Sequence, residues 1–413
     1  LFAVLIFGFQ YLPIQDYPVL LYQGFVFNQV VFHGFNFGGF FHFHSYLPPN
    51  AISTIIMGFM DLLFDPFVTG KIYLFFLAIA IYSGLYRYLV FHLNQRKTAF
   101  AAFAFLLTLN MHFLMGYLNF LTGLAIILHA IVVFREYNYY GRYLPMAAVF
   151  LLIYLCHFAT FALFVLYFFL FFLIKKNYRG LARMMVSAVP AIAIFLHYLF
   201  SRTIPILPLK ESYENVLSLI HWKLIILFAP LIPFTVFKWV QEIPMVFRVA
   251  DYVFIAIVLL LFIYSIVKHI ASKEYPFEFY LAFTTFLIAL FIPLNFGGVI
   301  PAGERVIALC AVNTFILLFR DKINPFIRRI GLIVCVLLGI ASYSYSVWNT
   351  ELFNSMVRRN EIPQDAIIHE SWKLEGTNGF LHLHFYDDIL QKRPYAFFEI
   401  GLFEYPAPNK NQE

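Results

Sequence analysis

Long apolar runs recur along nearly the whole chain, and they restrict the possible folds more than any other feature. Runs of about 15 to 22 residues, the length that crosses a bilayer core as a helix, follow one another from Leu1 to about Trp348. The composition agrees, because 62% of the 413 residues are hydrophobic and only 12% are charged. Soluble domains carry roughly 25% charged residues, and none of this size can bury so much apolar surface. The sequence therefore predicts an all-α polytopic integral membrane protein.

The hydrophobic pattern predicts about eleven spanning helices. They are expected near residues 1–13, 70–92, 99–114, 116–135, 143–157, 159–174, 181–200, 251–268, 276–293, 303–320 and 329–348. Two further runs, 50–65 and 224–240, are interrupted or bounded by proline, so each is predicted to be either re-entrant or interfacial. Because the chain starts at Leu1 without methionine, we expect the first run to be a shortened spanning helix and not a signal peptide.

Clusters of Lys and Arg predict the orientation in the membrane. Five connecting loops are basic, and they contain Arg96 and Lys97; Arg135 and Arg142; Lys175, Lys176, Arg179 and Arg183; Lys268 and Lys273; and Arg320, Lys322, Arg328 and Arg329. The positive-inside rule places all five in the cytoplasm. The net charge of +6 matters mainly for this orientation, and no nucleic-acid partner is expected.

Two segments differ from the spanning helices. Residues 14–50 would form the first extracytoplasmic loop, and they are too apolar for a solvated loop, so we expect helices that lie along the membrane surface. Residues 349–413 hold much of the charge and are expected to form a small extracytoplasmic tail domain after a transmembrane module of residues 1–348.

Asp16 is the leading candidate for chemistry. It lies between Pro13 and Pro18, just past the outer end of the first predicted helix, where water and a membrane-borne substrate both have access. An ionisable group at such a boundary is costly unless it is paired or used. The alternative is a carboxylate that only stops or caps a helix.

Histidines of the same loop offer a second candidate site. His33, His42 and His44 follow Asp16, and imidazole and carboxylate groups together suit Zn or Mn. Asp16, His42 and His44 are therefore candidate ligands of a divalent metal ion, although His42 and His44 would point the same way only on a strand. Because no tight ligand spacing is present, interfacial histidines without a metal are the favoured alternative.

Cations near the predicted outer face form a third group, composed of Arg202, Lys210, Lys223, Lys238, Arg248 and Arg305. The phosphate of a lipid carrier needs such partners at headgroup depth, and arginine can bind it through two hydrogen bonds. Arg305 stands out because it opens a predicted span beside Glu304. The alternatives are a Glu304–Arg305 boundary pair or a side chain that extends to the interface.

Polar residues within the apolar runs form a fourth group. Asn110, His112, Tyr117 and Asn119 lie on "LNMHFLMGYLNFLTG", and His157 lies in "YLCHFATF". Such residues either line a cavity or join neighbouring helices by hydrogen bonds, which is the commoner use.

The order of these features resembles the GT-C superfamily of polytopic glycosyltransferases and, more narrowly, a bacterial group of uncharacterised GT-C-like membrane proteins. The Asp-x-Pro-x-His stretch of that group is matched by Asp16 and Pro18, with Leu20 in place of the histidine. Its other motifs are matched by "YLPPN" (46–50), "GYLNF" (116–120), His157, Arg305, and "EIPQDAIIHES" and "HLHFYDD" in the tail.

The resemblance implies that a sugar is transferred, with inversion, from a polyprenyl-phosphate-linked donor to an acceptor at the outer face of the bacterial inner membrane. It implies Asp16 as the catalytic base or a metal ligand, with Arg305, Lys223 and Arg202 as contacts of the donor phosphate. The expected cavity-lining residues are His33, His42, His44, Asn50, Tyr117, Asn119, His157 and Glu304.

Two other functions remain open from the sequence. One is a non-catalytic GT-C-like subunit of a larger membrane complex, which the leucine at position 20 and the 54 phenylalanines allow. The other is a transporter of a lipid-linked or small solute, which would need a polar path across the midplane of the membrane. The spans contain few midplane charges and no evident repeat, so the transporter ranks below the transferase.

Overall fold

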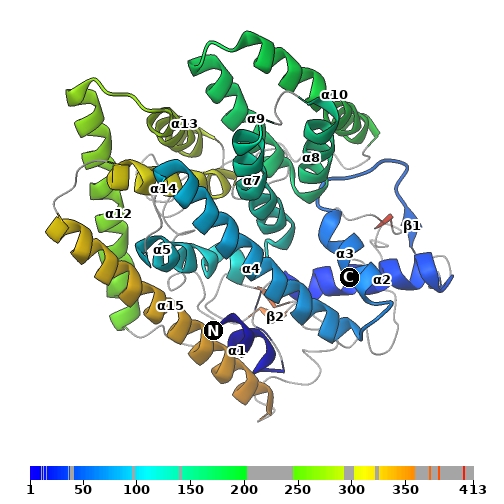
Figure 1. Ribbon diagram of the computed structural model, residues 1–413. Coiled ribbons are helices and arrows are strands. Elements are labelled where there is room, and N and C mark those ends of the chain that lie inside the picture. The colour runs from blue at the N-terminus through cyan, green and yellow to red at the C-terminus, as the bar shows by residue number, and fades with distance from the viewer. Residues whose placement is uncertain are drawn as a thin grey trace, which may run out of the picture.

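The computed structural model describes residues 1–10, 12, 14, 16–35, 37, 41–94, 98–138, 142–201, 245–292, 302–320 and 325–358, with the short strands 372–373, 380–381 and 403–404. These residues form a bundle of helices (Figure 1). Its helices are α1 (Phe2–Phe7), α2 (Tyr17–Phe32), α3 (Ile52–Met60), α4 (Pro66–Leu93), α5 (Thr98–Thr108), α6 (Met111–Leu114), α7 (Leu118–Glu136), α8 (Tyr143–Cys156), α9 (Phe158–Ile174), α10 (Tyr178–Ser201), α12 (Met245–Ser272), α13 (Phe277–Phe291), α14 (Ala302–Arg320) and α15 (Pro325–Arg358).

Every predicted span from 70–92 onward coincides with a helix or, for 99–114, with the pair α5 and α6. The prediction of a span over 1–13 is wrong in length, because α1 ends at Phe7 and Gly8 follows as its C-cap. The run 50–65 contains the short helix α3, and the run 224–240 lies outside the described residues.

Among the described residues, four helices are long and apolar enough to cross a membrane: Pro66–Leu93, Leu118–Glu136, Tyr178–Ser201 and Leu332–Leu352. Shorter apolar helices accompany them, and large apolar side chains such as Leu144 and Phe200 remain 82% and 85% exposed. These are the features of an all-α integral membrane protein. The predicted number of about eleven spans is not confirmed, because several of the expected spans correspond to shorter helices.

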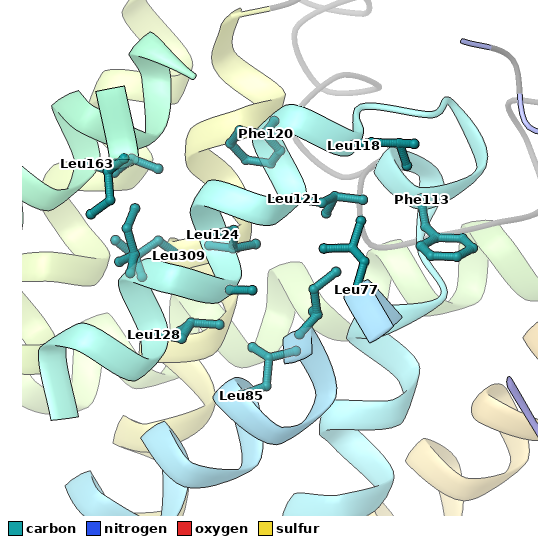
Figure 2. Packing of buried hydrophobic residues seen from close by; sticks show 14 of the residues in the cluster. Leu77, Leu85, Phe113, Leu118, Phe120, Leu121, Leu124, Leu128, Leu163 and Leu309 are labelled. Atoms are coloured by element: carbon teal, nitrogen blue, oxygen red, sulfur yellow. The ribbon is translucent and has the colours of Figure 1, made fainter. Parts of the chain in front are cut away.

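Helix α7 lies at the centre of the bundle. Of its most apolar stretch 72% is buried, against 28% for α10, and it packs against α4, α8 and α9. Figure 2 shows its leucine side chains facing α4, α9 and α14; the labelled residues are Leu118, Phe120, Leu121, Leu124 and Leu128 of α7, Leu77 and Leu85 of α4, Phe113 of α6, Leu163 of α9 and Leu309 of α14. Of the other candidate spans, α4 packs against α7, α10 packs against α8 and α9, and α15 packs against α5. All three are less buried than α7.

The first long loop contains the expected helix, but this helix is buried within the protein. Residues 17–28 of α2 are all buried, and α2 packs against α3 and α4. Packing therefore accounts for the apolar character of this segment. The strand β1 (His42–Phe43) pairs antiparallel with β4 (Phe403–Glu404), so the first loop and the tail are hydrogen-bonded to each other. A second short pair joins β2 (Trp372–Lys373) to β3 (Phe380–Leu381).

An ionic network around the buried Glu278 lies at one end of the bundle. Glu278, at the start of α13, bonds His92 near the end of α4 (2.7 Å) and Arg320 at the end of α14 (2.6 Å). Arg135, in the last turn of α7, lies 4.8 Å from the ring of Phe171 near the end of α9. The described ends of α4, α7, α9, α13 and α14 therefore lie at one end of the bundle, and in the sequence the five basic segments adjoin these helix ends.

Candidate functional site

Arg305 and His157 meet at the opposite end of the bundle. Arg305 lies near the start of α14 and is 8% exposed, while His157 joins α8 to α9 and is 4% exposed. The Nη1 of Arg305 contacts the Nε2 of His157, and the guanidinium carbon lies 4.3 Å from the centre of the Tyr117 ring. A cation at a helix N-terminus opposes the helix dipole. A buried arginine in that position favours an anionic ligand, which both the arginine and the dipole attract.

His157 has this position because it divides one long apolar run into two helices. Its backbone is extended (φ −169°, ψ 137°), and its Nδ1 accepts a hydrogen bond of 3.0 Å from the amide of Ala159. The side chain thus caps α9 and satisfies one of the amides that a helix start leaves without a partner. The cap holds the imidazole with Nε2 toward Arg305.

The turn before α7 joins Asp16 to the same region. Gly116 has φ +76°, in the left-handed region, and a Cβ there would lie 2.7 Å from the backbone nitrogen of Asp16. The Asp16 amide also donates to the carbonyl of Met115 (3.2 Å). One side of this turn therefore touches the Asp16 backbone, while the next residue, Tyr117, places its ring under Arg305. Only glycine permits this close approach.

The Asp16 side chain is half-buried and lies at the N-cap position of α2, but it makes no capping hydrogen bond to that helix. The alternative of a simple capping carboxylate therefore does not describe its side chain.

Asn50 and Asn119 lie around this site in different ways. The Oδ1 of Asn119 accepts a hydrogen bond of 2.9 Å from the amide of Ser53, so it caps α3. Asn50 is half-buried with φ +68°, and its neighbour Ala51 donates to the carbonyl of Leu155 at the end of α8 (2.9 Å). Asn119 is thus used in the packing of helices, and Asn50 lies beside the α8–α9 junction.

The histidines of the first loop do not gather into a metal site within the described part of the chain. His33 and His42 are exposed, and His44 is half-buried and stacked on Tyr46 with ring centres 4.5 Å apart. Within the part of the chain that the structure describes, no group of three or more His, Cys, Asp or Glu residues could hold a metal ion. The expected set of Asp16, His42 and His44 is therefore not brought together.

Several predicted cations lie outside the described residues: Arg202, Lys210, Lys223 and Lys238. Glu304 belongs to α14 and Arg248 to α12, but the structure describes only the backbone of these two residues.

His112 is a member of this cluster that the sequence analysis did not assign to the site. It is fully buried in α6, and its ring centre lies 5.1 Å from that of Phe120 and 5.8 Å from that of Tyr117. Neither ring nitrogen has a hydrogen-bond partner among the described residues. In the sequence, His112 is distinguished only as a polar residue within an apolar segment, and Asn119 is another such residue.

An apolar cavity of about 510 Å³ lies along α9. It is lined only by apolar side chains of α9, α13 and α14, together with Ile292: Phe158, Ala159, Phe161, Ala162, Leu163, Val165, Leu166, Phe169, Ile288, Ile292 and Val306. Phe158 and Val306 are the chain neighbours of His157 and Arg305, and the cavity extends along α9 to Phe169. A hydrocarbon chain fits a cavity with this lining.

Comparison of the chain with protein-family models, curated proteins and solved structures gives no match. The function is therefore inferred from the chemistry of this site.

Proposed function

We propose that the protein is a membrane glycosyltransferase that moves a sugar from a polyprenyl-phosphate-linked donor to an acceptor hydroxyl. The observation that carries this proposal is the contact between a buried arginine and histidine, together with an apolar cavity whose lining includes their chain neighbours, Val306 and Phe158. A donor of this class has a long hydrocarbon tail and an anionic phosphate. The apolar cavity suits the tail, and the cationic Arg305 suits the phosphate.

The cavity would hold the first isoprene units of the tail, since burial of apolar surface favours binding by roughly 25 cal/mol per Å². The phosphate would lie at Arg305, whose guanidinium can donate two parallel hydrogen bonds to it. The start of α14 adds the positive end of its dipole.

Asp16 would act as the catalytic base. It takes the proton of the acceptor hydroxyl while the hydroxyl oxygen attacks the anomeric carbon from the face opposite the phosphate. The bond between the anomeric carbon and the phosphate oxygen breaks, its electron pair stays on the phosphate, and the configuration at the anomeric carbon is inverted. Arg305 and His157 stabilise the charge of the leaving phosphate.

The placement of these groups supports the assignment. Asp16 and Arg305 contact opposite sides of the turn at Gly116 and Tyr117, so a reacting sugar would lie near that turn. The site is at the end of the bundle opposite the basic loops, which the positive-inside rule assigns to the cytoplasm. We therefore propose that transfer occurs at the extracytoplasmic face of the plasma membrane.

The variant Asp16→Asn tests the role of the base. The purified full chain in lipid nanodiscs is incubated with a panel of radiolabelled polyprenyl-phosphate monosaccharides and with membrane extracts as the source of acceptor. We expect Asp16→Asn to lower the rate of transfer by roughly 10² or more, the usual contribution of a general base, and to leave the binding of farnesyl phosphate unchanged. Asp65→Asn is the matched control, because Asp65 caps α4 and does not belong to this site. Full activity of Asp16→Asn would refute the assignment.

A further inference from the structure

The imidazole of His112 makes no hydrogen bond to the described residues that would explain its burial. It is fully buried, and neither ring nitrogen has a partner among the described residues. Buried polar atoms in native proteins are nearly always hydrogen-bonded, and a nitrogen left without a partner destabilises the fold. An exception of this kind indicates that a group outside the chain supplies the missing partner.

The ring of Phe120 connects His112 to the two other basic groups of the site. Its centre lies 5.1 Å from the His112 ring and 5.7 Å from the His157 ring. The guanidinium carbon of Arg305 also lies 5.7 Å from it. Two imidazoles and one guanidinium therefore lie close to a single aromatic side chain.

The hydrogen bond at the α9 cap determines which nitrogen of His157 carries the proton. Its Nδ1 accepts from the Ala159 amide, so in the neutral ring the proton is on Nε2. This Nε2 faces Nη1 of Arg305, which is itself a donor. The Nε2 proton of His157 can therefore be donated to an acceptor that binds beside Arg305.

We propose that His112 is a third hydrogen-bond donor, beside His157 and Arg305, to a phosphate group that binds at this point. An anionic phosphate has acceptor oxygens only, so it can take one hydrogen bond from each of the three side chains. The inference rests on the proposed function, where the phosphate belongs to the lipid carrier, but the same chemistry would bind a free phosphate ion. His112 is a binding residue here and takes no part in proton transfer.

The test compares three probes on the purified full chain in detergent: farnesyl phosphate, farnesol and inorganic phosphate. Their binding is measured by thermal shift, and that of the two phosphates also by ³¹P NMR titration, for the wild type and for His112→Leu, which removes the donor. Loss of a hydrogen bond to a charged group should weaken farnesyl phosphate binding by roughly tenfold or more, while farnesol binding stays unchanged. His129→Leu is the matched control, because His129 contacts Ser83 and the Ala80 carbonyl in the contact between α7 and α4.

The outcomes separate the alternatives. A loss of farnesyl phosphate and farnesol binding to the same extent would mean a packing role and overturn the proposal, as would unchanged affinity for farnesyl phosphate. Inorganic phosphate that binds as tightly as farnesyl phosphate, with the same loss in His112→Leu, would identify free phosphate as the ligand. Weaker phosphate binding in His112→Leu without any sugar transfer by the wild type would support this site and refute the proposed transferase.

A measurement on the wild-type chain covers the case in which His112→Leu does not fold. Solid-state NMR with ¹⁵N-labelled histidine and bound farnesyl phosphate detects dipolar coupling between phosphorus and nearby ring nitrogens. We expect coupling to two imidazoles, those of His112 and His157. Coupling to a single imidazole would overturn the proposal.

Discussion

Replacing Asp61 with asparagine should stabilise the protein above about pH 7. Asp61 lies in the turn between α3 and α4, outside the helices that are candidates for spanning the membrane. Its two carboxylate oxygens are buried, and neither is in hydrogen-bond geometry with a described residue. Burial raises the pKa of this carboxyl from 3.8 to about 7; the nearby Thr69 hydroxyl opposes part of the rise, and Asp65 adds to it.

The sign and size of the effect follow from these two pKa values. Below the unfolded pKa of 3.8 both states hold the proton. As the pH rises toward 7, the unfolded chain releases the proton while the folded chain keeps it, so the free energy of unfolding falls. The difference of about three pKa units corresponds to an upper limit of about 4 kcal/mol, at 1.36 kcal/mol per unit. Because Asp61 is only partly buried as a residue, we expect between about 1 and 4 kcal/mol.

Thermal unfolding of the full chain in detergent, followed from about pH 4 to about pH 9, measures this effect. Asp61→Asn should lose this part of the pH dependence and have a higher Tm than the wild type above pH 7. In Asp65→Asn the pH dependence should remain, because Asp65 accepts a hydrogen bond from the Phe67 amide (2.9 Å) and an asparagine can replace this cap. Parallel pH profiles for the wild type and Asp61→Asn would refute the reasoning.

Two further substitutions test the fold and the cavity. Glu278→Gln should lower the free energy of unfolding by about 3 kcal/mol, because it removes the charge between a buried histidine and an arginine. Glu136→Gln, in an exposed pair, should lower the free energy of unfolding by less than about 1 kcal/mol. Equal losses for Glu278→Gln and Glu136→Gln in denaturant titrations would contradict this. Ala162→Phe should fill the cavity and weaken farnesyl phosphate binding while inorganic phosphate binding stays unchanged. Ala193→Phe, on the exposed face of α10, should change neither, and unaltered farnesyl phosphate binding in Ala162→Phe would contradict a tail site in the cavity.

Much of the helical framework could be predicted from local patterns. The expected span 70–92 corresponds to α4 at Pro66–Leu93, and 116–135 corresponds to α7 at Leu118–Glu136. These agreements arise because the length of an apolar run and the positions of prolines act locally. The expected span 1–13 failed, since Gly8 ends α1 within an apolar run and hydrophobicity alone does not mark that end.

The candidate site was predictable only in part. Arg305 and Asp16 were selected as charges within apolar surroundings, and the structure joins both to one turn. Asn119 and His112 look alike in the sequence, as polar residues of the same apolar segment. The structure separates them, because Asn119 caps α3 while the nitrogens of His112 have no partner within the described residues.

The sequence by itself determined that this protein is helical and suited to lipid, since apolar runs of bilayer length have no other favourable environment. It also determined which loops are basic, because charge is a property of each residue alone. Only the tertiary structure decided that α7 is central, that α2 is buried, and that residues 112, 117, 157 and 305 meet in one cluster. These residues are far apart in the chain, and their meeting depends on how the helices pack. Packing is set by the shapes of all side chains together, which no local pattern contains.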